Sequence, residues 1–364
     1  MRLAFVYLQG RSARLAELAR GEAPSEFFYG AAELAAAGHT VEHFEFAPQS
    51  PAPMRAAGMD LLRRAYLTPP KVLGHTWMNA WAFSPRLNEF DCVVATSGHH
   101  AFALAGCAAV GRLRRPVVGI QCGLLHYPYS ALRRAITRGL LNRMHSMSFG
   151  EAEHAPTLEA FRLDPARLSV NQFGVDPRFW TPEGGREDFV LAIGNDSRRD
   201  YATLLAAAEE IAAPIRLVTR LPLPEPLPGN VTVLRGSWHD RTLSDADIRQ
   251  LYRRARCVIT PLHNTLQPSG QSVTLQAMAC GAPVVLTRTR GLWNPDALRD
   301  GENIRLVSPS QPRELAAAAR ALLADSAALQ RLGEAGRRYV LEHGNIADFA
   351  RRIGEACERA IGQQ

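Results

Sequence analysis

The chain has 364 residues, of which 46% are hydrophobic and 21% are charged. This composition is typical of a soluble globular protein long enough for two domains with separate cores. No apolar run reaches the ~18 residues that a bilayer crossing requires, and the start of the chain, MRLAFVYLQG, lacks a signal-peptide core with a cleavage site. We therefore expect a cytoplasmic protein rather than an integral membrane or secreted one.

The net charge of +7 comes almost entirely from arginine, because Lys71 is the only lysine. A basic chain could bind nucleic acid, an anionic membrane surface or an anionic small substrate. The sequence contains no zinc-finger, RNP or other nucleic-acid-binding motif, which argues against the first of these partners. The 6 cysteines are scattered without CxxC pairs, so we expect reduced, buried thiols and no zinc site.

Residues 1–180 alternate predicted strands and helices, which is typical of a parallel, doubly wound α/β domain. The first strand, Arg2–Leu8, is apolar and ends just before Gly10. Ligands of such sheets bind beyond the carboxyl ends of the strands, so we expect the loop from Gly10 to Glu26 to border a cleft. Residues 47–71 are Pro-rich with weak periodicity and predict an irregular excursion.

Two adjacent histidines, His99 and His100, follow a buried strand predicted at residues 91–95. At a strand end they could act as a base, orient a substrate or bind a metal ion. No third ligand lies at a suitable spacing, which argues against a metal site. The remaining alternative to substrate contact is a simple turn that caps the following helix. We retain His100 as a candidate catalytic residue.

The segment 131–147, ALRRAITRGLLNRMHSM, predicts a helix with an apolar stripe and a basic band formed by Arg133, Arg134 and Arg138. Such a band could hold the protein as a peripheral protein on the inner face of an anionic membrane. The alternative is the solvated face of an ordinary surface helix.

Residues 171–182 predict a linker, and a second set of strands begins at residues 189–193. Within this half, Asp245 and Asp247 form the DxD pattern of metal-dependent transferases. They follow Ser244 at the start of a predicted amphipathic helix. Because acidic residues stabilise the amino end of a helix, we interpret this DxD as a helix start rather than a metal site.

The run from Pro268 to Val285, PSGQSVTLQAMACGAPVV, predicts a loop, a helix, a stop and a buried strand. The first amides of a helix lack intrahelical partners and carry the positive end of the macrodipole, so they can bind an anion. Gly270 permits close backbone approach, and Ser272 can cap the helix or donate to a phosphate oxygen. Gln276 would border a cleft, and Gly281 would end the helix. The alternative is an ordinary αβ unit without a ligand.

This run resembles the donor-binding segment of the retaining family 4 glycosyltransferases of the GT-B fold, whose common form is a Gly-containing turn followed by LLEAMACGxPVV. The segment RGLWNPDALRDGENIRLV resembles the family's DGxNGxLV pattern. NQFGVDPRFWTP resembles its interdomain signature, and AELAAAGHTVEHFEF resembles its first helix and second strand. These matches follow the family's order over most of the chain.

The resemblance implies an α/β architecture of the GT-B type, with two Rossmann-like doubly wound domains facing an interdomain cleft. Residues 1–180 would form the acceptor-binding domain, and residues 181–346 would form the nucleotide-sugar-binding domain. The last helix, residues 347–364, would pack back on the first domain.

The resemblance also implies which residues form the site. In the family, an arginine at a strand end and a lysine several residues later neutralise the donor diphosphate. Asn195 occupies the arginine position, so Arg198 or Arg199 would supply the cation, for which the planar arginine fork is well suited. We take Arg198, Arg199 and His100 as the candidate catalytic residues. The predicted donor-binding residues are Gly10, Gly194, Asn195, Trp238, Gly270, Gln271, Ser272, Val273 and Gln276.

The sequence departs from the family pattern at three further positions. The family's two glutamates, eight positions apart, would fall on Pro268 and Gln276. In the family, the first glutamate contacts the sugar and the second accepts hydrogen bonds from the ribose. The amide oxygen of Gln276 can also accept such hydrogen bonds, but they are weaker than those to a carboxylate. Cys122 replaces a family histidine near the donor sugar, and His126 or His100 could substitute for it.

The resemblance implies transfer of a sugar from a nucleotide diphosphate sugar, with UDP- or GDP-linked donors expected, to a small molecule, a saccharide or a lipid. Transfer would proceed with retention and without a metal ion or other cofactor. The alternative is a catalytically silent GT-B subunit that binds a nucleotide or supports a partner enzyme. A nicotinamide dehydrogenase is disfavoured because no GxGxxG motif follows a predicted strand.

Overall fold

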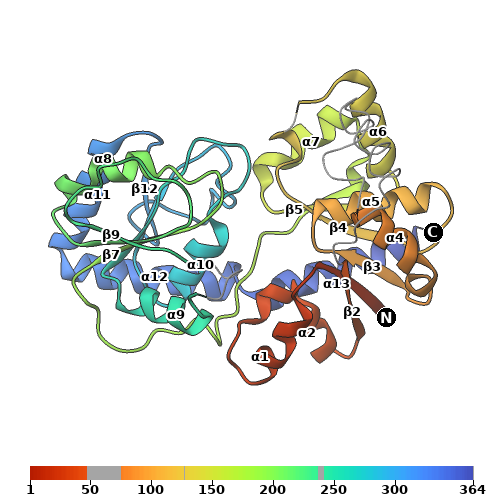
Figure 1. Ribbon diagram of the computed structural model, residues 1–364, viewed down its shortest axis with the longest axis horizontal. Coiled ribbons are helices and arrows are strands. Elements are labelled where there is room, and N and C mark those ends of the chain that lie inside the picture. Colours follow the sequence, from red (N-terminus) through yellow and green to blue (C-terminus); the bar gives the residue numbers. More distant parts are fainter. Residues whose placement is uncertain (47–74, 127, 237–241, 364) are drawn as a thin grey trace. The chain divides into compact units, whose positions relative to one another are not determined.

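The computed structural model describes residues 1–46, 75–126, 128–236 and 242–363. The chain forms two compact units (Figure 1). The first comprises residues 1–17, 27–172 and 349–364, and the second comprises residues 18–26 and 173–348. The boundary after Gln172 lies earlier than the boundary at 180 expected from the sequence. The predicted excursion at 47–71 lies outside the described residues.

The first unit contains a 6-stranded parallel sheet in the order β2-β1-β3-β4-β5-β6. Parallel strands in a doubly wound sheet are covered on both faces, which explains their nearly continuous apolar runs. The strands are β1 (Arg2–Leu8), β2 (Thr40–Phe46), β3 (Cys92–Ala95), β4 (Val117–Gln121), β5 (His145–Ser148) and β6 (Leu168–Val170).

The helices of the first unit are α1 (Leu15–Ala19), whose last two residues group with the second unit, α2 (Ala31–Ala36), α4 (His75–Leu87), α5 (Gly98–Ala109), α6 (Ala131–Leu141) and α7 (His154–Phe161). The helix predicted over 131–147 was too long. Its last residues form β5, which is fully buried and pairs with β4 and β6. The final helix, α13 (Ile346–Gly362), groups with the first unit from Phe349 onward.

The second unit contains another 6-stranded parallel sheet, in the order β12-β11-β10-β7-β8-β9. Its strands are β7 (Val190–Ile193), β8 (Ile215–Val218), β9 (Val231–Leu234), β10 (Cys257–Thr260), β11 (Val284–Thr287) and β12 (Arg305–Val307). Its helices are α8 (Tyr201–Ile211), α9 (Asp245–Arg254), α10 (Gln271–Ala279), α11 (Pro312–Ala324) and α12 (Ser326–His343).

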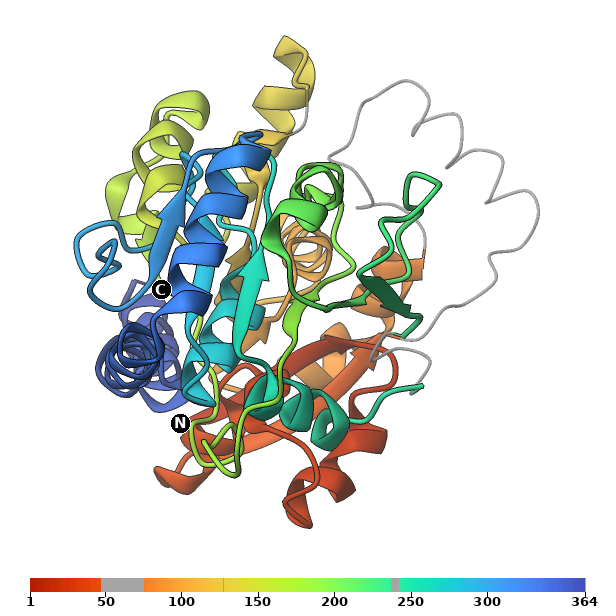
Figure 2. The ribbon, with the colours of Figure 1, turned by 90° about the vertical axis from the view of Figure 1, so that its left-hand side faces the viewer.

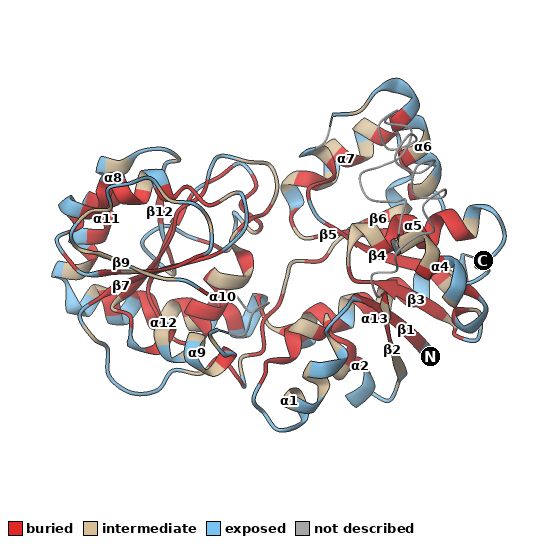
Figure 3. Cartoon of the chain, viewed as in Figure 1, coloured by how far each residue is buried: buried red, intermediate tan, exposed pale blue. Residues whose placement is uncertain are grey.

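Side chains of this second sheet alternate between its two faces, as strand geometry requires. Leu191 and Val258 belong to the core that includes residues of α9, α10 and α12. Val190 and Ile259 belong to the core on the other face, with residues of α8 and α11 (Figure 2). The central strands are therefore buried on both sides, as the red ribbon of Figure 3 shows.

The helix ends confirm two predictions from the sequence. Ser244 and Asp247 form a capping box at the start of α9, so the DxD pattern serves as a helix start. Gly281, with a φ of +71°, ends α10, and its N–H donates to the carbonyl of Met278 at 2.9 Å. Among the described residues, no helix combines the length and apolar character needed to cross a membrane.

Candidate functional site

The amino end of α10 lies just beyond the carboxyl end of β10. Gly270 is its N-cap residue, with a φ of +77°, and this glycine has no side chain with which to cap the helix. A Cβ atom at Gly270 would lie 2.9 Å from the Cγ2 atom of Thr260, so only glycine fits without a shift. Thr274 fixes the first turn, since its hydroxyl bonds that of Thr260 at 3.3 Å. The start of α10 is therefore fixed by the close fit of Gly270 and by Thr274 rather than by the side chain of an N-cap residue.

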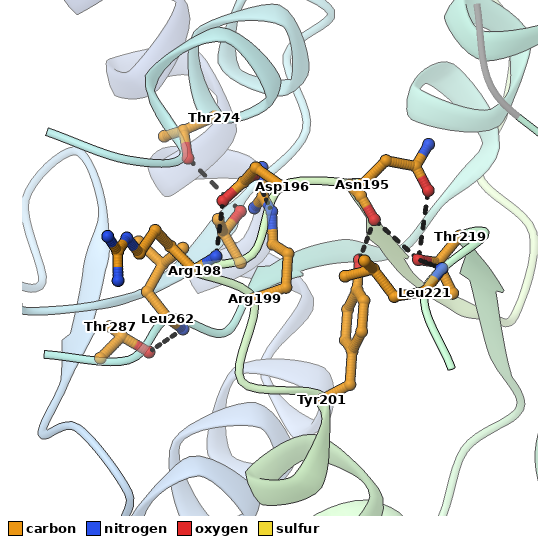
Figure 4. A network of polar contacts seen from close by, with 12 residues as sticks. Asn195, Asp196, Arg198, Arg199, Tyr201, Thr219, Leu221, Leu262, Thr274 and Thr287 are labelled. Atoms are coloured by element: carbon orange, nitrogen blue, oxygen red, sulfur yellow. Dashed lines mark hydrogen bonds and ion pairs between the residues drawn. The ribbon is translucent and has the colours of Figure 1, made fainter. Parts of the chain in front are cut away.

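Arg199 lies in the loop that joins β7 to α8 and is only 7% exposed. Its guanidinium lies so close to the backbone of Gly194 that a Cβ atom there would overlap with it. Its Nε atom donates to the carboxylate of Asp196 at 2.7 Å, whereas its buried Nη1 atom has no hydrogen-bond partner among the described residues (Figure 4). A buried N–H without an acceptor is costly, so this atom is suited to an anionic ligand.

The hydrogen bonds that position Arg198 among the described residues are made by its backbone. Its N–H donates to the carboxylate of Asp196 at 3.1 Å, and its carbonyl accepts from the N–H of His263 at 2.9 Å. Figure 4 shows its guanidinium directed away from Arg199. The two arginines offered by the sequence thus have different surroundings, and Arg199 is the one that the fold buries and orients.

Leu262 connects Arg199 to the start of α10. Its backbone forms an isolated bridge with that of Arg199, and its side chain would lie 3.2 Å from a Cβ atom at Gly270. The N–H of Leu262 donates to the hydroxyl of Thr287 at the end of β11, at 3.1 Å. Three strand ends therefore support one small region of the second unit.

Asn195, at the family's arginine position, organises neighbouring loops. Its Oδ1 atom accepts from the backbone N–H of Arg220 at 2.6 Å, and its Nδ2 atom donates to the carbonyl of Gly236 at 3.2 Å. The adjacent carbonyl of Gly194 accepts from the hydroxyls of Tyr201 and Thr219, both at 2.8 Å. The amide of Asn195 thus ties together the loops that follow β7, β8 and β9.

Gln276 does not face open space, because it is only 6% exposed. Its Nε2 atom donates to the carboxyl group of Glu26 at 3.1 Å, and its Oε1 atom accepts from the hydroxyl of Tyr252 at 3.4 Å. The sequence predicted that Gln276 borders a cleft. In the structure it lies instead in a buried polar cluster within the second unit.

Glu26 is the residue of this region that sequence reasoning missed. Its carboxyl group also accepts from the indole N–H of Trp180 at 2.6 Å and from the backbone N–H of Asp176 at 2.9 Å. Burial raises the pKa of Glu26 to about 7, although these hydrogen bonds act in the opposite direction. A single glutamate in the short 3-10 helix Ser25–Phe28 has no sequence pattern, and Gln276 lies 250 positions away.

The other predicted donor-binding residues of the second unit lie in the first turn of α10. Gln271 is buried, and Ser272 and Val273 are half-buried. Trp238 lies in the segment 237–241, outside the described residues.

His100 lies in the first turn of α5, the helix that follows β3. Ser97 caps this helix, and its side chain accepts from the N–H of His100. The imidazole is 1% exposed and packs edge-on against Phe46, with ring centroids 5.2 Å apart. Burial lowers the pKa of His100 to about 4, so the ring is neutral. This placement favours the capping role over contact with a substrate.

The remaining first-unit candidates are at the carboxyl edge of that sheet. The N–H of Gly10 donates to the carboxylate of Glu45 at 3.2 Å, which fixes the loop after β1. Cys122 and His126 are exposed in the loop after β4. In the first turn of α6, Arg133 is 3% exposed and lies over the ring of Tyr129, so it does not belong to a basic surface band.

Comparison with known sequences gives one family profile and several curated relatives. A profile of the family described as glycosyl transferases group 1 matches residues 190–325. The MMP alpha-(1->4)-mannosyltransferase of Mycolicibacterium hassiacum is 28% identical over 228 residues, which cover 60% of this chain and 54% of the relative. The alpha-maltose-1-phosphate synthase of Mycobacterium tuberculosis is 27% identical over 223 residues, which cover 52% of this chain and 56% of the relative. The chain spans about half the length of these curated relatives.

Solved structures match the whole chain. Sucrose-phosphate synthase from Thermosynechococcus elongatus superposes with a TM-score of 0.71 at 18% identity and covers 100% of both chains. Anabaena HepE in complex with UDP-glucose superposes with a TM-score of 0.68 at 17% identity, covering 98% of this chain and 99% of that one. At such identities the likeness shows the fold alone. Residues 190–325 are therefore similar to the group 1 glycosyl transferases, and the chain has the GT-B fold that its sequence predicted.

Proposed function

We propose that this chain transfers a sugar from a nucleotide diphosphate sugar to an acceptor. One observation carries the proposal. The buried Nη1 atom of Arg199 lacks a partner among the described residues, and Leu262 joins this arginine to the amino end of α10, whose N-cap residue is Gly270. A guanidinium and the amides at the start of a helix are both suited to phosphate oxygens.

The chemistry of the proposal follows from the charge of the leaving group. When the sugar departs, the nucleotide diphosphate gains negative charge, which must be stabilised at the transition state. The amides of α10 and the guanidinium of Arg199 would do this from fixed positions. We therefore propose transfer without a metal ion, and retention at the anomeric carbon on the strength of the family resemblance.

The names of the relatives support a sugar-transfer reaction. One is a mannosyltransferase and another is a maltose-1-phosphate synthase, and the HepE structure contains UDP-glucose. UDP- and GDP-linked sugars are the first donors to test. The acceptor of the proposed reaction is a small molecule, a saccharide or a lipid.

A catalytically silent subunit is the second candidate. Pro268 and Gln276 stand where the family has two glutamates, and the amide of Gln276 is already bonded to Glu26. Such a subunit would bind a nucleotide without consuming any nucleotide sugar.

Measuring the unfolding temperature with UDP, GDP and dTDP, and with the matching nucleosides, tests the proposal. A bound nucleotide stabilises the fold by mass action, so at least one diphosphate should raise this temperature more than its nucleoside does. If no diphosphate binds, the enzyme proposal is overturned. If a diphosphate binds but no nucleotide sugar is consumed with any class of acceptor, the silent subunit is favoured.

Peripheral attachment to a membrane through α6 is a further part of the proposal, but the basic surface of this helix is smaller than the sequence predicted. With Arg133 buried, the basic groups of this helix are Arg134 and Arg138, beside the exposed Leu132. Sedimentation with anionic vesicles should decrease when Arg134 and Arg138 are both replaced with Gln. Equal sedimentation of the variant would remove this part of the proposal.

A further inference from the structure

Arginines gather at the amino edge of the first sheet. Arg115 lies two residues before β4, Arg143 lies two residues before β5, and Arg167 directly precedes β6. These three strands are neighbours and run parallel, so their amino ends meet at one edge of the sheet. Substrates of doubly wound sheets bind at the opposite, carboxyl edge. The arginines are therefore separate from the edge at which the proposed acceptor would bind.

A cavity of about 420 Å³ lies at this edge, within the first unit. The three arginines line it together with Arg114, and the end of α13 contributes Ala360 and Gln363. Within the part of the chain that the structure describes, no acidic residue lines this cavity. Its volume is in the range of small-molecule sites, and its uniform positive charge favours an anion.

Two of the lining guanidinium groups are available to a ligand. Arg115 donates to the carbonyl of Asn88 at 2.9 Å, as expected of a side chain that supports a loop. In contrast, the side chains of Arg143 and Arg167 form no hydrogen bond or ion pair with any other described residue. Arg143 is exposed and Arg167 is half-buried. The planar fork of an arginine can bind two oxygens of one phosphate group.

A buried histidine lines the same cavity. The imidazole of His145 is 3% exposed, and its Nε2 atom bonds the hydroxyl of Ser169 at 2.9 Å. Its Nδ1 atom is also buried and has no partner in the described ranges. Burial lowers the pKa of His145 to about 4. The charges of Arg359 and Arg167 act in the same direction, whereas the backbone of Ala166 opposes them.

Arginines near the carboxyl end of a helix can have a simpler role, because they stabilise the negative end of the macrodipole. This role fits Arg143, which follows the C-cap residue of α6, Asn142. It does not fit Arg167, which ends a 3-10 helix of only 3 residues, Pro165–Arg167. A shared ligand accounts for both arginines.

We infer that this cavity is a second ligand site of the chain, which binds a small phosphorylated molecule through Arg143 and Arg167. The inference goes beyond the proposed function, because the site lies at the other edge of the first sheet from the proposed acceptor. A bound phosphate would join the starts of β5 and β6 and contact the end of α13. It should therefore stabilise the folded chain.

Inorganic pyrophosphate is the probe, and the proposed donor site would bind it too. The experiment therefore uses Arg199→Ala as the background, in which that site is weakened. Three proteins are compared in this background: without further change, with the pair Arg143→Gln and Arg167→Gln, and with a control pair. The control, Arg313→Gln with Arg320→Gln, removes the same charge from exposed positions of α11. Titration calorimetry in 0.15 M NaCl measures the dissociation constant of pyrophosphate.

The pair Arg143→Gln and Arg167→Gln should weaken pyrophosphate at least about tenfold, because hydrogen bonds to a charged ligand are lost. The control pair should leave the affinity unchanged. Pyrophosphate should raise the unfolding temperature of the background and control proteins, but not that of the protein with both cavity arginines replaced. Replacement of the two arginines with lysine retains the charge and removes the fork, so its affinity should lie between those of the arginine and glutamine proteins.

Equal pyrophosphate affinity with and without the two cavity arginines would overturn the inference. So would the absence of pyrophosphate binding in Arg199→Ala, or an equal loss in the control pair. Sedimentation with vesicles of phosphatidylglycerol distinguishes a lipid headgroup from a free ligand. If only vesicle binding depended on Arg143 and Arg167, the site would serve a membrane and the inference would be wrong. None of these results affects nucleotide binding by the wild type, on which the proposed function depends.

Discussion

Arg199 shows how a single side chain can indicate a ligand. Its ion pair with Asp196 satisfies the Nε atom, and the close backbone of Gly194 leaves room for the guanidinium, yet Nη1 stays unbonded among the described residues. We predict that Arg199→Ala weakens UDP binding by roughly ten- to a hundredfold, since hydrogen bonds to charged groups contribute about 1.5–3 kcal/mol. Uridine binding should change little. Titration calorimetry measures both.

Arg320→Ala is a suitable control for this prediction, because Arg320 is exposed on α11 and donates to the carbonyl of Glu210 at 3.3 Å. The Arg320→Ala variant should bind UDP with the affinity of the wild type. If Arg199→Ala lost affinity for UDP and uridine equally, Arg199 would support the fold of the site rather than bind the phosphates.

Glu26 leads to a prediction about pH. Burial raises the pKa of its carboxyl group from 4.5 to about 7, so the folded state binds more protons than the unfolded state between these values. The free energy of unfolding should therefore fall as the pH rises from 4.5 to 7, by up to about 3 kcal/mol from this residue. Glu26→Gln should remove that fall.

Denaturant unfolding at several pH values between 4.5 and 8 measures the effect in both proteins. The charged and titratable groups around Glu26 are the carboxylate of Asp176, which pairs with Arg178, and the hydroxyl of Tyr252. These groups are shared by the wild type and the variant, so the difference between the two curves isolates Glu26. Parallel curves would contradict the prediction.

At the scale of elements, the start of α10 depends on one glycine. A left-handed backbone at a residue with a Cβ atom costs roughly 1–2 kcal/mol, and at Gly270 the new atom would also meet Thr260 at 2.9 Å. Gly270→Ala should therefore lower the free energy of unfolding by about 1 kcal/mol more than Gly301→Ala does. Gly301 has nearly the same φ, +76°, but no heavy atom within 4 Å of its Cβ position.

Urea unfolding of both glycine variants measures that difference, and UDP titration shows its effect on the site. Gly270→Ala should also weaken UDP, because the first amides of α10 move with their N-cap. If Gly270→Ala and Gly301→Ala lower the free energy of unfolding equally, the close approach to Thr260 does not affect stability.

At the scale of the whole molecule, the proposal requires no metal ion. The charge of the departing diphosphate would be met by the amino end of α10 and by Arg199, so sugar transfer should persist in EDTA. A turnover assay with and without the chelator tests this. Loss of turnover that returns on addition of Mn²⁺ would show that metal independence is wrong.

The sequence predicted most of what local patterns control. Buried apolar runs indicated the central strands, Ser244 and Asp247 indicated the start of α9, and Gly281 indicated the end of α10. The prediction over 131–147 was wrong because helical periodicity continued into β5, where pairing between two other strands decides the structure. Long-range pairing overrides local propensity in such cases.

The site was less predictable for a related reason. Motif spacing identified Arg198 and Arg199 together, but only three-dimensional packing distinguishes a buried guanidinium from a half-buried one. The cluster around Gln276 depends on Glu26, which is 250 positions away and belongs to no recognisable pattern.

The grouping of residues 18–26 with residues 173–348 has a practical meaning for protein engineering. A chimera made by one cut near residue 172 would combine residues 173–348 of this chain with a foreign amino-terminal half. The indole of Trp180 and the amide of Gln276 would then lose the acceptor that Glu26 provides. A chimera designed to exchange the second unit should therefore transfer residues 18–26 together with residues 173–348.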